Sequence, residues 1–486
     1  MSGRSSINEG SASAAQAADD PGDHFATRLR SAVKGAVLFP RDPGFTAEHA
    51  GFNPAVRHTP EAIVVPDDAG DIRATVRLAS LLGLPVAVQA TGHGISAAAD
   101  GGILINTRRL GSVTIDPVER VARVAAGARM REVVEAAAAH GLAAINGASL
   151  DVGAVGYTLG GGLGPLGRKH GYAADHVRAI DLVTPGGRLL RLSPDQHEDL
   201  FWAVRGGKSN FGVVTSMEIG LVTMAALYGG ALFFLGEAAD RVVRAYPAWA
   251  AELPEEMTTT LAFMRLPEAP TVPPPLQGRV AVRLTAAYLG GEEEGERLLA
   301  PMLAAGPKLG SMGALPYEKI GTIANDPPVA PLPVYERTGL LHTLDDAAVE
   351  RLLALAGPDA TLPPGVIELR QLGGALARPA AVPNAIGHRD AGFLLFMANP
   401  APADQAREVK GLQQNLMDAL EPHLTGGMLP NFMSSSDLAP ERVRAAYTPA
   451  DYERLARLKQ LHDPRNLFRV NHNIEPGDVT RPAATP

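Results

Sequence analysis

A histidine between two glycines is the first feature of the sequence that could do chemistry. Thr91-Gly92-His93-Gly94 interrupts an apolar run that begins at Val86 and resumes at Ile103. The two glycines remove side-chain bulk beside the imidazole and let successive backbone N–H groups point at an anion, an arrangement that binds phosphate without a lysine. The segment is typical of a loop pressed against a flat, charged ligand. A β-turn that happens to contain a histidine is the alternative.

A second segment, residues 147–171, is dense in glycine without being a low-complexity repeat. Within it, residues 162–167 match the pattern GxGxxG. A dinucleotide-binding fingerprint of that form must follow an apolar strand and begin a helix, whereas Pro165 and Gly171 leave room for only one or two helical turns. The pattern therefore does not indicate a Rossmann fold, and the glycines need another explanation.

A third segment, Gly206-Gly207-Lys208-Ser209, looks like the end of a phosphate-binding P-loop. A P-loop has a glycine five positions before the glycine that precedes the lysine, and Trp202 occupies that position. The spacing excludes a P-loop. An NAD-dependent or nucleotide-hydrolysing enzyme would rest only on these two patterns, and we expect neither NAD nor ATP to stabilise the protein.

The composition is that of an ordinary, mildly acidic globular protein. The chain has 486 residues, 46% of them apolar, and a formal net charge of -8. This length favours two domains, and the charge provides no basic surplus for nucleic acid or anionic membranes. Without any cysteine, disulfides, thiolate metal sites and cysteine nucleophiles are excluded, so redox chemistry would need a bound cofactor. We expect no metal site, no nucleic-acid partner and no membrane partner.

The N-terminal residues have no apolar run of the signal-peptide kind, and no run of about 18 apolar residues occurs in the sequence. We therefore expect a cytoplasmic protein. Residues 1–22 have few apolar side chains and are expected to be disordered.

Small αβ units are expected to position the two glycine-rich segments. Apolar runs and helical spacing predict a strand, a helix and a strand before His93, and a helix that ends near Gly141. A hairpin and a further strand pair follow from apolar runs bounded by turn residues. The expected strands are 62–65, 86–88, 103–105, 113–115, 121–124, 179–183 and 188–192, and the expected helices are 68–82, 130–140 and 199–207.

The pattern changes near residue 222, where longer strands begin to alternate with amphipathic helices. This alternation predicts an antiparallel sheet with helices on one face. The expected strands are 227–235, 259–266, 280–289, 366–372 and 393–398, and the expected helices are 238–251, 292–304, 347–356 and 402–420. Proline-rich segments at 267–275 and 327–333 are expected to be loops. A last helix, 452–461, would place Leu455, Leu458 and Leu461 on one face.

Four motifs in this order resemble the flavoprotein family of vanillyl-alcohol oxidase and p-cresol methylhydroxylase, and within it the berberine-bridge-enzyme-like oxidoreductases. The motifs cover nearly all of residues 57–222 and 440–476. They are GHG with DGGILINTRRL, VGAVGYTLGGGLGPLGRKHGYAADHVRAIDLVTPGGRLL, DLFWAVRGGKSNFGVVTSME and YERLARLKQLHDPRNLFRVNHNIEP.

The resemblance implies an α+β fold with a two-part FAD-binding domain of the p-cresol methylhydroxylase type and a substrate domain whose antiparallel sheet is covered by helices on one face. The expected division is a disordered tail at 1–22, the N-terminal part of the FAD-binding domain at 23–222, the substrate domain at 223–430, a segment returning to the FAD domain at 431–476, and a tail at 477–486.

The resemblance also assigns cofactor-binding residues. His93 matches the histidine that bonds covalently to the 8α-methyl group of the flavin, and Ala90, Thr91, Gly92 and Gly94 surround it in the loop that wraps the pyrophosphate. Ser149 stands where many relatives have a second linking cysteine, which implies a single link here. The flavin ring and ribityl chain would lie along Val152, Gly153, Gly156, Gly162, Gly164 and Gly171.

The remaining cofactor contacts come from later in the chain. Val214 matches the backbone position that pairs with adenine, and Asn471 and Asn473 match the terminal motif on the pyrimidine side of the flavin. On the residues alone, these two asparagines would be taken as turn formers.

Two positions argue against a sugar substrate. Sugar oxidases that resemble this chain have a tyrosine two residues before the asparagine of a YxN motif, and here that residue is Leu429, before Asn431. Their acidic partner falls three residues before a Gly-Gly pair, and here that residue is Arg370. The resemblance therefore disfavours carbohydrate oxidation.

Candidate catalytic residues follow from strand alternation. In residues 366–372, Ile367 and Leu369 would face the helices, which turns Glu368 and Arg370 toward the substrate pocket. An ordinary cross-strand ion pair is the alternative. Two apolar residues on the next strand, Leu395 and Met397, are expected to line a hydrophobic pocket, and the phenols of Tyr157 and Tyr447 could hold or relay a proton.

Together these features predict an FAD-dependent oxidoreductase that transfers a hydride from a small, apolar or aromatic, non-sugar substrate to flavin N5. Because Val152 would leave the oxygen approach open, where a bulkier leucine goes with dehydrogenases in the family, dioxygen is the expected acceptor and hydrogen peroxide the product. A dehydrogenase with another acceptor and a flavin-bearing binding protein without turnover are the alternatives.

Overall fold

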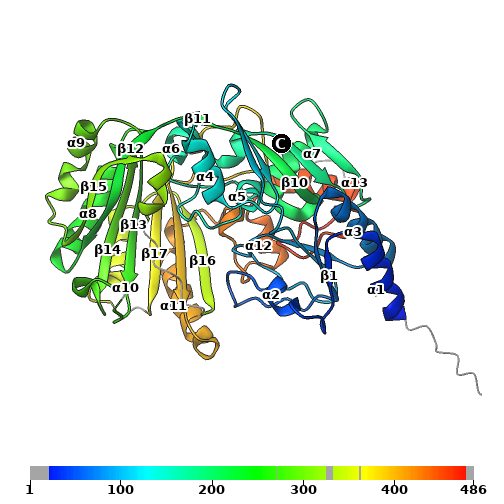
Figure 1. Cartoon of the computed structure of the whole chain (residues 1–486). Helices are drawn as coiled ribbons and strands as arrows, with labels where there is room; N and C mark the ends of the chain where they lie inside the picture. The colour runs from blue at the N-terminus through cyan, green and yellow to red at the C-terminus, as the bar shows by residue number, and fades with distance from the viewer. Residues whose placement is uncertain (1–20, 271, 325–331, 361–362, 478–486) are drawn as a thin grey trace, which may run out of the picture.

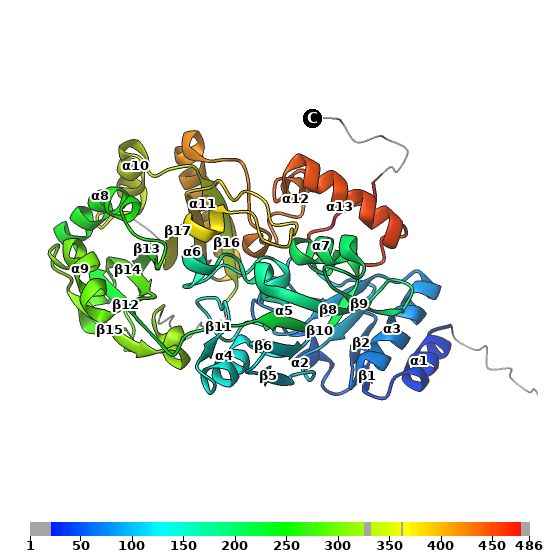
Figure 2. The ribbon, with the colours of Figure 1, turned by 90° about the horizontal axis from the view of Figure 1, so that it is seen from above.

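The computed structural model describes residues 21–270, 272–324, 332–360 and 363–477, and it has two lobes that lie side by side (Figure 1, Figure 2). The first lobe contains two small sheets, and the second contains one large sheet. Most of the predicted disordered tail lies outside the described residues; α1 (Pro21–Ala32) begins at Pro21. The predicted boundaries at 222 and 430 stay predictions. Across the described residues, no helix has the length and apolar character needed to cross a membrane.

The four-stranded sheet of the first lobe has the order β1-β2-β4-β3. β3 (Val86–Gln89) and β2 (Ala62–Val65) both pair in parallel with β4 (Ile103–Asn106), and β1 (Ala36–Leu38) pairs antiparallel with β2. A parallel pair needs a crossover connection. α3 (Ala69–Leu82), which begins after Asp68 and ends at Gly83, makes the first crossover, and the segment that contains His93 makes the second. α2 (Phe45–His49) packs near β2.

The five-stranded sheet has the order β5-β6-β10-β8-β9, and all its pairs are antiparallel. Its strands are β5 (Val113–Asp116), β6 (Val121–Ala125), β8 (Val177–Val183), β9 (Leu189–Leu192) and β10 (Val213–Gly220). β7 (Leu142–Ala143) and β11 (Val222–Thr223) form a separate pair. The helices are α4 (Met130–Ala138), α5 (Ala154–Leu159), α6 (Gly167–His170), α7 (Glu198–Gly207), α12 (Pro440–Arg444) and α13 (Pro449–His462).

The second lobe is a seven-stranded antiparallel sheet of order β15-β12-β14-β13-β17-β18-β16. Its strands are β12 (Ala226–Phe234), β13 (Met257–Arg265), β14 (Val280–Tyr288), β15 (Leu309–Pro316), β16 (Val334–Leu341), β17 (Gly365–Gln371) and β18 (Phe393–Pro400). The helices α8 (Glu237–Ala251), α9 (Glu292–Leu303), α10 (Asp346–Ala356) and α11 (Ala406–Leu420) cover one face (Figure 2).

This architecture confirms the predicted α+β class with an antiparallel sheet covered on one face. Two strands of the large sheet, β15 and β16, were not predicted from the sequence. β15 contains two glycines and is mostly exposed at the sheet edge, so it lacks an apolar alternation. The prediction for Leu461 was wrong, because its side chain is 69% exposed. Each step of three residues rotates about 300° around a helix, so Leu461 has drifted about 120° from Leu455.

Candidate functional site

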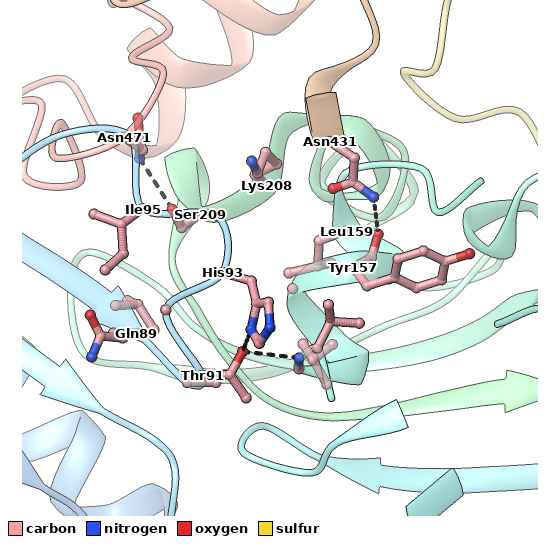
Figure 3. Close-up of a pocket in the computed structure, with 18 of the residues that line it drawn as sticks. Gln89, Thr91, His93, Ile95, Tyr157, Leu159, Lys208, Ser209, Asn431 and Asn471 are labelled. Carbon is pink, nitrogen blue, oxygen red and sulfur yellow. Dashed lines mark hydrogen bonds between the residues drawn. The ribbon is translucent and has the colours of Figure 1, made fainter. Parts of the chain in front are cut away.

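A cavity of about 380 Å³ lies where the two lobes meet, and segments from many parts of the chain line it (Figure 3). The lining consists of β3 and the connection after it, residues 147–163, residues 208–214, Arg370 of β17, the Asn431–Phe432 pair, the Val470–Asn471 pair, His58, Thr107 and Ala126. The volume falls in the range of small-molecule and cofactor pockets.

His93 lies on one wall of this cavity. Its Nδ1 is 2.8 Å from Oγ1 of Thr91, and its ring stacks on Phe52 with the ring centroids 3.9 Å apart. The backbone N–H of Gly153 donates to the same Thr91 hydroxyl at 3.1 Å, which joins the His93 loop to the start of α5. Burial, and next the nearby charge of Arg129, lower the pKa of His93 to about 4. The imidazole is therefore neutral near pH 7.

The glycines around His93 and α5 are of two kinds. A Cβ at Gly92, where φ is +76°, would lie 2.4 Å from the Cα of Gly51, so the close approach of two backbones requires glycine there. A Cβ at Gly94 or Gly156 would meet no atom of the described chain within 4 Å. Both line the cavity. Protein packing does not explain these last two glycines, but a ligand lying against the backbone would.

The segment 149–157 brings predicted residues to the cavity, whereas the following glycines do not all reach it. Ser149, Val152, Gly153, Gly156 and Tyr157 line the cavity. Gly162 and Gly171, which were expected along the cofactor, are not among the residues that line the cavity. At Gly162 a Cβ would lie 2.6 Å from that of Ala173, and Gly171, with φ of +84°, ends α6.

Gly164 likewise does not line this cavity, although it borders a neighbouring pocket. A Cβ at Gly164 would come within 1.8 Å of the carbonyl oxygen of Asn146, so close backbone packing explains its lack of a side chain.

The C-terminal segment is held against the first lobe by a buried cation. Lys459 of α13 is fully buried, and its Nζ donates to Asp463 and to the carbonyl oxygens of Asn210 and Phe468 at 2.7–3.1 Å. This places Asn471 on the cavity, where its Nδ2 donates to Ser209 at 3.2 Å while its buried Oδ1 has no partner among the described residues. Asn473 also has an unpartnered Oδ1 but is not among the lining residues.

Val214, which the resemblance assigns to the adenine, lines the cavity from the start of β10. Ala90, Thr91 and Gly94 line it from the connection after β3. The structure thus brings together residues from segments more than 370 positions apart in the sequence: Thr91 and Asn471 share one cavity.

On the second lobe, the predicted alternation holds. Ile367 and Leu369 pack in the core beneath the helices. Glu368 is buried, with Oε1 accepting from Arg283 at 3.0 Å and Oε2 accepting from Arg370 at 2.6 Å. Burial alone would raise the pKa of Glu368, but Arg370 and then Arg283 hold it below its usual value. The carboxylate of Glu368 is ionised. Glu368 and Arg370 therefore form an ion pair, and Arg370 also lines the cavity, so the two alternatives predicted for these residues do not exclude each other.

The ring of Tyr157 points away from His93 (Figure 3), and its hydroxyl lies close enough to Arg370 for that charge to act on its pKa. Its hydroxyl is buried without a partner among the described residues, and burial raises the pKa of this phenol. At neutral pH it remains a hydrogen-bond donor. Asn431 fixes the same turn by donating to the carbonyl oxygen of Tyr157 at 2.6 Å.

Two other expectations are corrected. Leu395 and Met397 do not line a pocket; each pairs with a residue of β17 that faces the helices, so both lie in the core of the second lobe. Tyr447 does not reach the cavity, because it is packed in the core of the first lobe and its hydroxyl donates to the carbonyl oxygen of Gly206 at 3.1 Å.

The structure adds Lys208, which the sequence analysis treated only as part of a rejected P-loop. Lys208 lines the cavity, and its Nζ contacts the carbonyl oxygen of Pro430 at 3.3 Å. Burial lowers its pKa to about 8, and no carboxylate of the described residues pairs with it. The sequence signal that could have identified Lys208 as a binding residue was its place in a glycine-rich segment, but only the fold shows which cavity its side chain enters. Phe432 is a further lining residue that was not predicted.

Comparison with known proteins agrees with the site. A family model described as FAD binding domain matches residues 60–193, and one described as berberine and berberine like matches residues 415–475. The chain thus contains an FAD-binding domain and a berberine-like segment, and it is an FAD-linked oxidoreductase. The chain is 29% identical over 473 residues to (R)-6-hydroxynicotine oxidase of Paenarthrobacter nicotinovorans, covering 91% of this chain and 97% of that protein.

Solved structures of FAD-linked oxidoreductases agree. The 6-hydroxy-D-nicotine oxidase of Arthrobacter nicotinovorans has a TM-score of 0.81 at 27% identity, covering 93% of this chain and 100% of that one. The glucooligosaccharide oxidase of Acremonium strictum, described with a 6-S-cysteinyl, 8α-N1-histidyl FAD, has a TM-score of 0.79 at 19% identity, covering 93% of this chain and 99% of that one. The second likeness shows a shared fold.

The residues of this FAD-linked oxidoreductase fit its cofactor. Gly94 and Gly156 leave their side of the cavity open, and the buried Oδ1 of Asn471 lacks a partner that a ligand N–H could supply. Backbone N–H groups of the Ala90–Gly94 loop suit a pyrophosphate, and Lys208 provides a cation in the same cavity.

Proposed function

We propose that this enzyme carries FAD tethered to His93 alone and oxidises a small, non-sugar organic substrate, with dioxygen as acceptor and hydrogen peroxide as product. The observation that carries the proposal is a neutral imidazole inside the glycine-lined cavity. When bound, FAD accepts a hydride from the substrate at N5 and passes its electrons to the acceptor.

The single tether rests on the two side chains at the linking positions. The low pKa of His93 keeps a ring nitrogen available for bonding at neutral pH. Ser149 also lines the cavity and supplies a hydroxyl where the doubly linked relatives have a cysteine thiol. A histidyl link without a cysteinyl link follows.

The roles of the chain around the substrate are to bind and orient. Arg370 presents a guanidinium to the cavity, and the protonated phenol of Tyr157 can donate a hydrogen bond. Glu368 is a poor base, because two guanidiniums stabilise its ionised form. We therefore assign Glu368 to holding Arg370 in place and leave the base unassigned.

A non-sugar substrate is favoured by the apolar character of the lining. Leu429, at the position of the family tyrosine, is buried away from the cavity, while Leu159, Leu163 and Phe432 line it. Such a surface suits an apolar or aromatic body better than a ring of hydroxyl groups. The cytoplasm is the expected location within this proposal, and fractionation of native cells would test it.

The tether is tested by the colour of the protein. Purified protein should be yellow, and acid precipitation should leave the colour with the polypeptide. His93→Ala should keep some FAD in the glycine-lined cavity, lose it to the supernatant on precipitation, and have a lower reduction potential. Colour that washes out of the wild-type precipitate would contradict the tether without contradicting FAD binding.

Turnover and acceptor are tested separately. After anaerobic photoreduction, mixing with air-saturated buffer in a stopped-flow instrument should reoxidise the flavin rapidly, with hydrogen peroxide formed. Reoxidation over many minutes would favour a dehydrogenase that uses another acceptor. A panel of small alcohols and amines should include compounds that reduce the flavin, and failure of every compound would leave the binding-protein alternative.

A further inference from the structure

A small pocket of about 50 Å³ adjoins the main cavity on the side of the seven-stranded sheet. The two share Ala148, Leu163 and Arg370 as lining residues, so they are direct neighbours. Side chains of the sheet face that lies opposite the helices form its floor, among them Thr260, Thr285 and Glu368. This pocket has no role in the cofactor contacts described above.

The guanidinium of Arg370 lies where the small pocket meets the main cavity, and one of its nitrogens has no hydrogen-bond acceptor in the described part of the chain. Its Nε and Nη2 both donate to Oε2 of Glu368, at 2.9 and 2.6 Å. The guanidinium also lies over the rings of Phe432 and Phe396, at 5.1 and 5.6 Å from their centroids. Its Nη1 donates to no group in the described part of the chain. The guanidinium of Arg370 is therefore held in place, and its Nη1 can still donate a hydrogen bond to a ligand.

Among the described residues, the pocket has no free carboxylate for a positively charged ligand. Glu368 is the one carboxylate of the described chain that lines the pocket or the main cavity, and each of its oxygens already accepts from a guanidinium. An ammonium group placed here would face Arg370 without a counter-ion. A negatively charged oxygen would instead meet the donors of Arg370 and the hydroxyl groups of Thr260 and Thr285.

The size of the pocket limits what can enter. A volume of about 50 Å³ holds on the order of three or four water-sized groups. A carboxylate fits this space, and a sugar ring does not. The remainder of such a molecule would lie in the main cavity beside Leu163 and Phe432, which are apolar.

We propose that the substrate carries a carboxylate, which binds Nη1 of Arg370 in this pocket while its apolar body lies in the main cavity. The inference rests on the proposed function, because it names the substrate class of the same site. A carboxylate would distinguish this substrate from the one for which the 6-hydroxy-D-nicotine oxidase of like fold is named.

The test compares ligands of one shape and different charge. Benzoate, benzamide and benzylamine are titrated into the yellow holoenzyme at pH 7, and binding is followed by the change in flavin absorbance. Benzoate should bind about 10- to 100-fold more tightly than benzamide, since a hydrogen bond between charged groups replaces a neutral one. Benzylamine should bind more weakly than benzamide. Equal affinities for the three would overturn the inference.

Variants locate the effect. Arg370→Met should abolish the preference for benzoate over benzamide, and Arg370→Lys should keep part of it because the charge remains. Arg378→Met, on the exposed surface, is the matched control and should bind all three ligands as the wild type does. An unchanged preference in Arg370→Met, or none left in Arg370→Lys, would overturn the inference.

The flavin spectrum shows whether a negative result contradicts only the carboxylate inference or the proposed function as well. Yellow protein, with the same FAD content in wild type and variants but no charge preference, overturns the carboxylate assignment and leaves the proposed function standing. Colourless wild-type protein overturns the proposed function and the inference together.

Discussion

The two walls of the cavity are built in different ways. On the first lobe the wall consists of the Ala90–Gly94 loop and the Ser149–Gly156 segment, and we call it the glycine wall; it offers mostly backbone and small side chains. On the second lobe, Arg370 lines the cavity, and Glu368, Thr260 and Thr285 continue from it into the adjoining pocket; we call these four residues the sheet wall, which offers long, charged and hydroxyl side chains.

This difference separates what a family shares from what an individual enzyme selects. The matched family segments, 60–193 and 415–475, contain the glycine wall and lie outside all seven strands of the large sheet. A wall of backbone groups binds the same cofactor in many relatives, since few side chains need to agree. Where side chains form the wall, a single substitution can change which ligand the site binds.

The strongest expected effect is on the sheet wall. Glu368→Ala takes the carboxylate from a buried guanidinium pair, and breaking a buried pair in this way costs about 3–5 kcal/mol of unfolding free energy. Urea unfolding of the holoenzyme measures it. Glu350→Ala, which removes an exposed pair with Arg244, should cost at most about 1 kcal/mol. Similar losses in both variants would show that Glu368 contributes no more than a surface ion pair.

The glycine wall should respond differently at two neighbouring positions. Gly92→Ala forces a Cβ against the backbone of Gly51 at a left-handed φ, so it should lower the unfolding free energy by about 1–3 kcal/mol even without FAD. Gly94→Ala meets no protein atom, so it should leave that free energy unchanged but reduce the FAD retained. The measurements are urea unfolding and the ratio of flavin to protein absorbance. Normal FAD content in Gly94→Ala would argue against a cofactor lying on this wall.

A pH dependence arises at the buried His472, which follows the cavity residue Asn471 in the sequence. Burial, and then the charge of Lys208, lower the pKa of His472 to about 4. Between pH 6.5 and 4 the unfolded chain therefore binds a proton that the folded chain does not. This contribution to stability is present above pH 6.5 and is lost as the pH falls toward 4, and it amounts to about 3 kcal/mol.

Urea unfolding at pH 7 and pH 4 checks this prediction. His472→Asn should lose less stability over that interval than the wild type does, whereas replacement of the exposed His140 by asparagine should leave the interval unchanged. An identical pH dependence in all three proteins would show that His472 does not stay neutral in the folded state.

The smallest effect concerns oxygen access at Val152. Val152→Leu adds bulk to the glycine wall beside the cavity, and we expect flavin reoxidation to slow by about tenfold, which corresponds to roughly 1.4 kcal/mol. Stopped-flow reoxidation measures the rate. Val152→Ala is the control and should not be slower than wild type. Equal rates in all three proteins would place the oxygen path elsewhere.

Much of the fold could be predicted because the relevant signals are local. Apolar runs and helical spacing predicted β2, α3 and β3 in order, and all four helices that cover the large sheet. The edge strands β15 and β16 were missed, because one is glycine-rich and exposed and the other is interrupted by charged residues. Alternation correctly turned Glu368 and Arg370 away from the helices, but the same reasoning was not applied to Leu395 and Met397.

The sequence alone determined the glycine wall of this protein. A backbone that must approach another backbone or a ligand closely can use only glycine, so the requirement is visible in residue types at Gly92 and Gly94. The tertiary structure decided the sheet wall. Arg283 and Glu368 are 85 positions apart and meet only through the register of β14, β13 and β17. Lys208 likewise lines the cavity because the fold places the end of α7 beside the Pro430 turn. The partners of a side chain depend on which segments the fold brings to it.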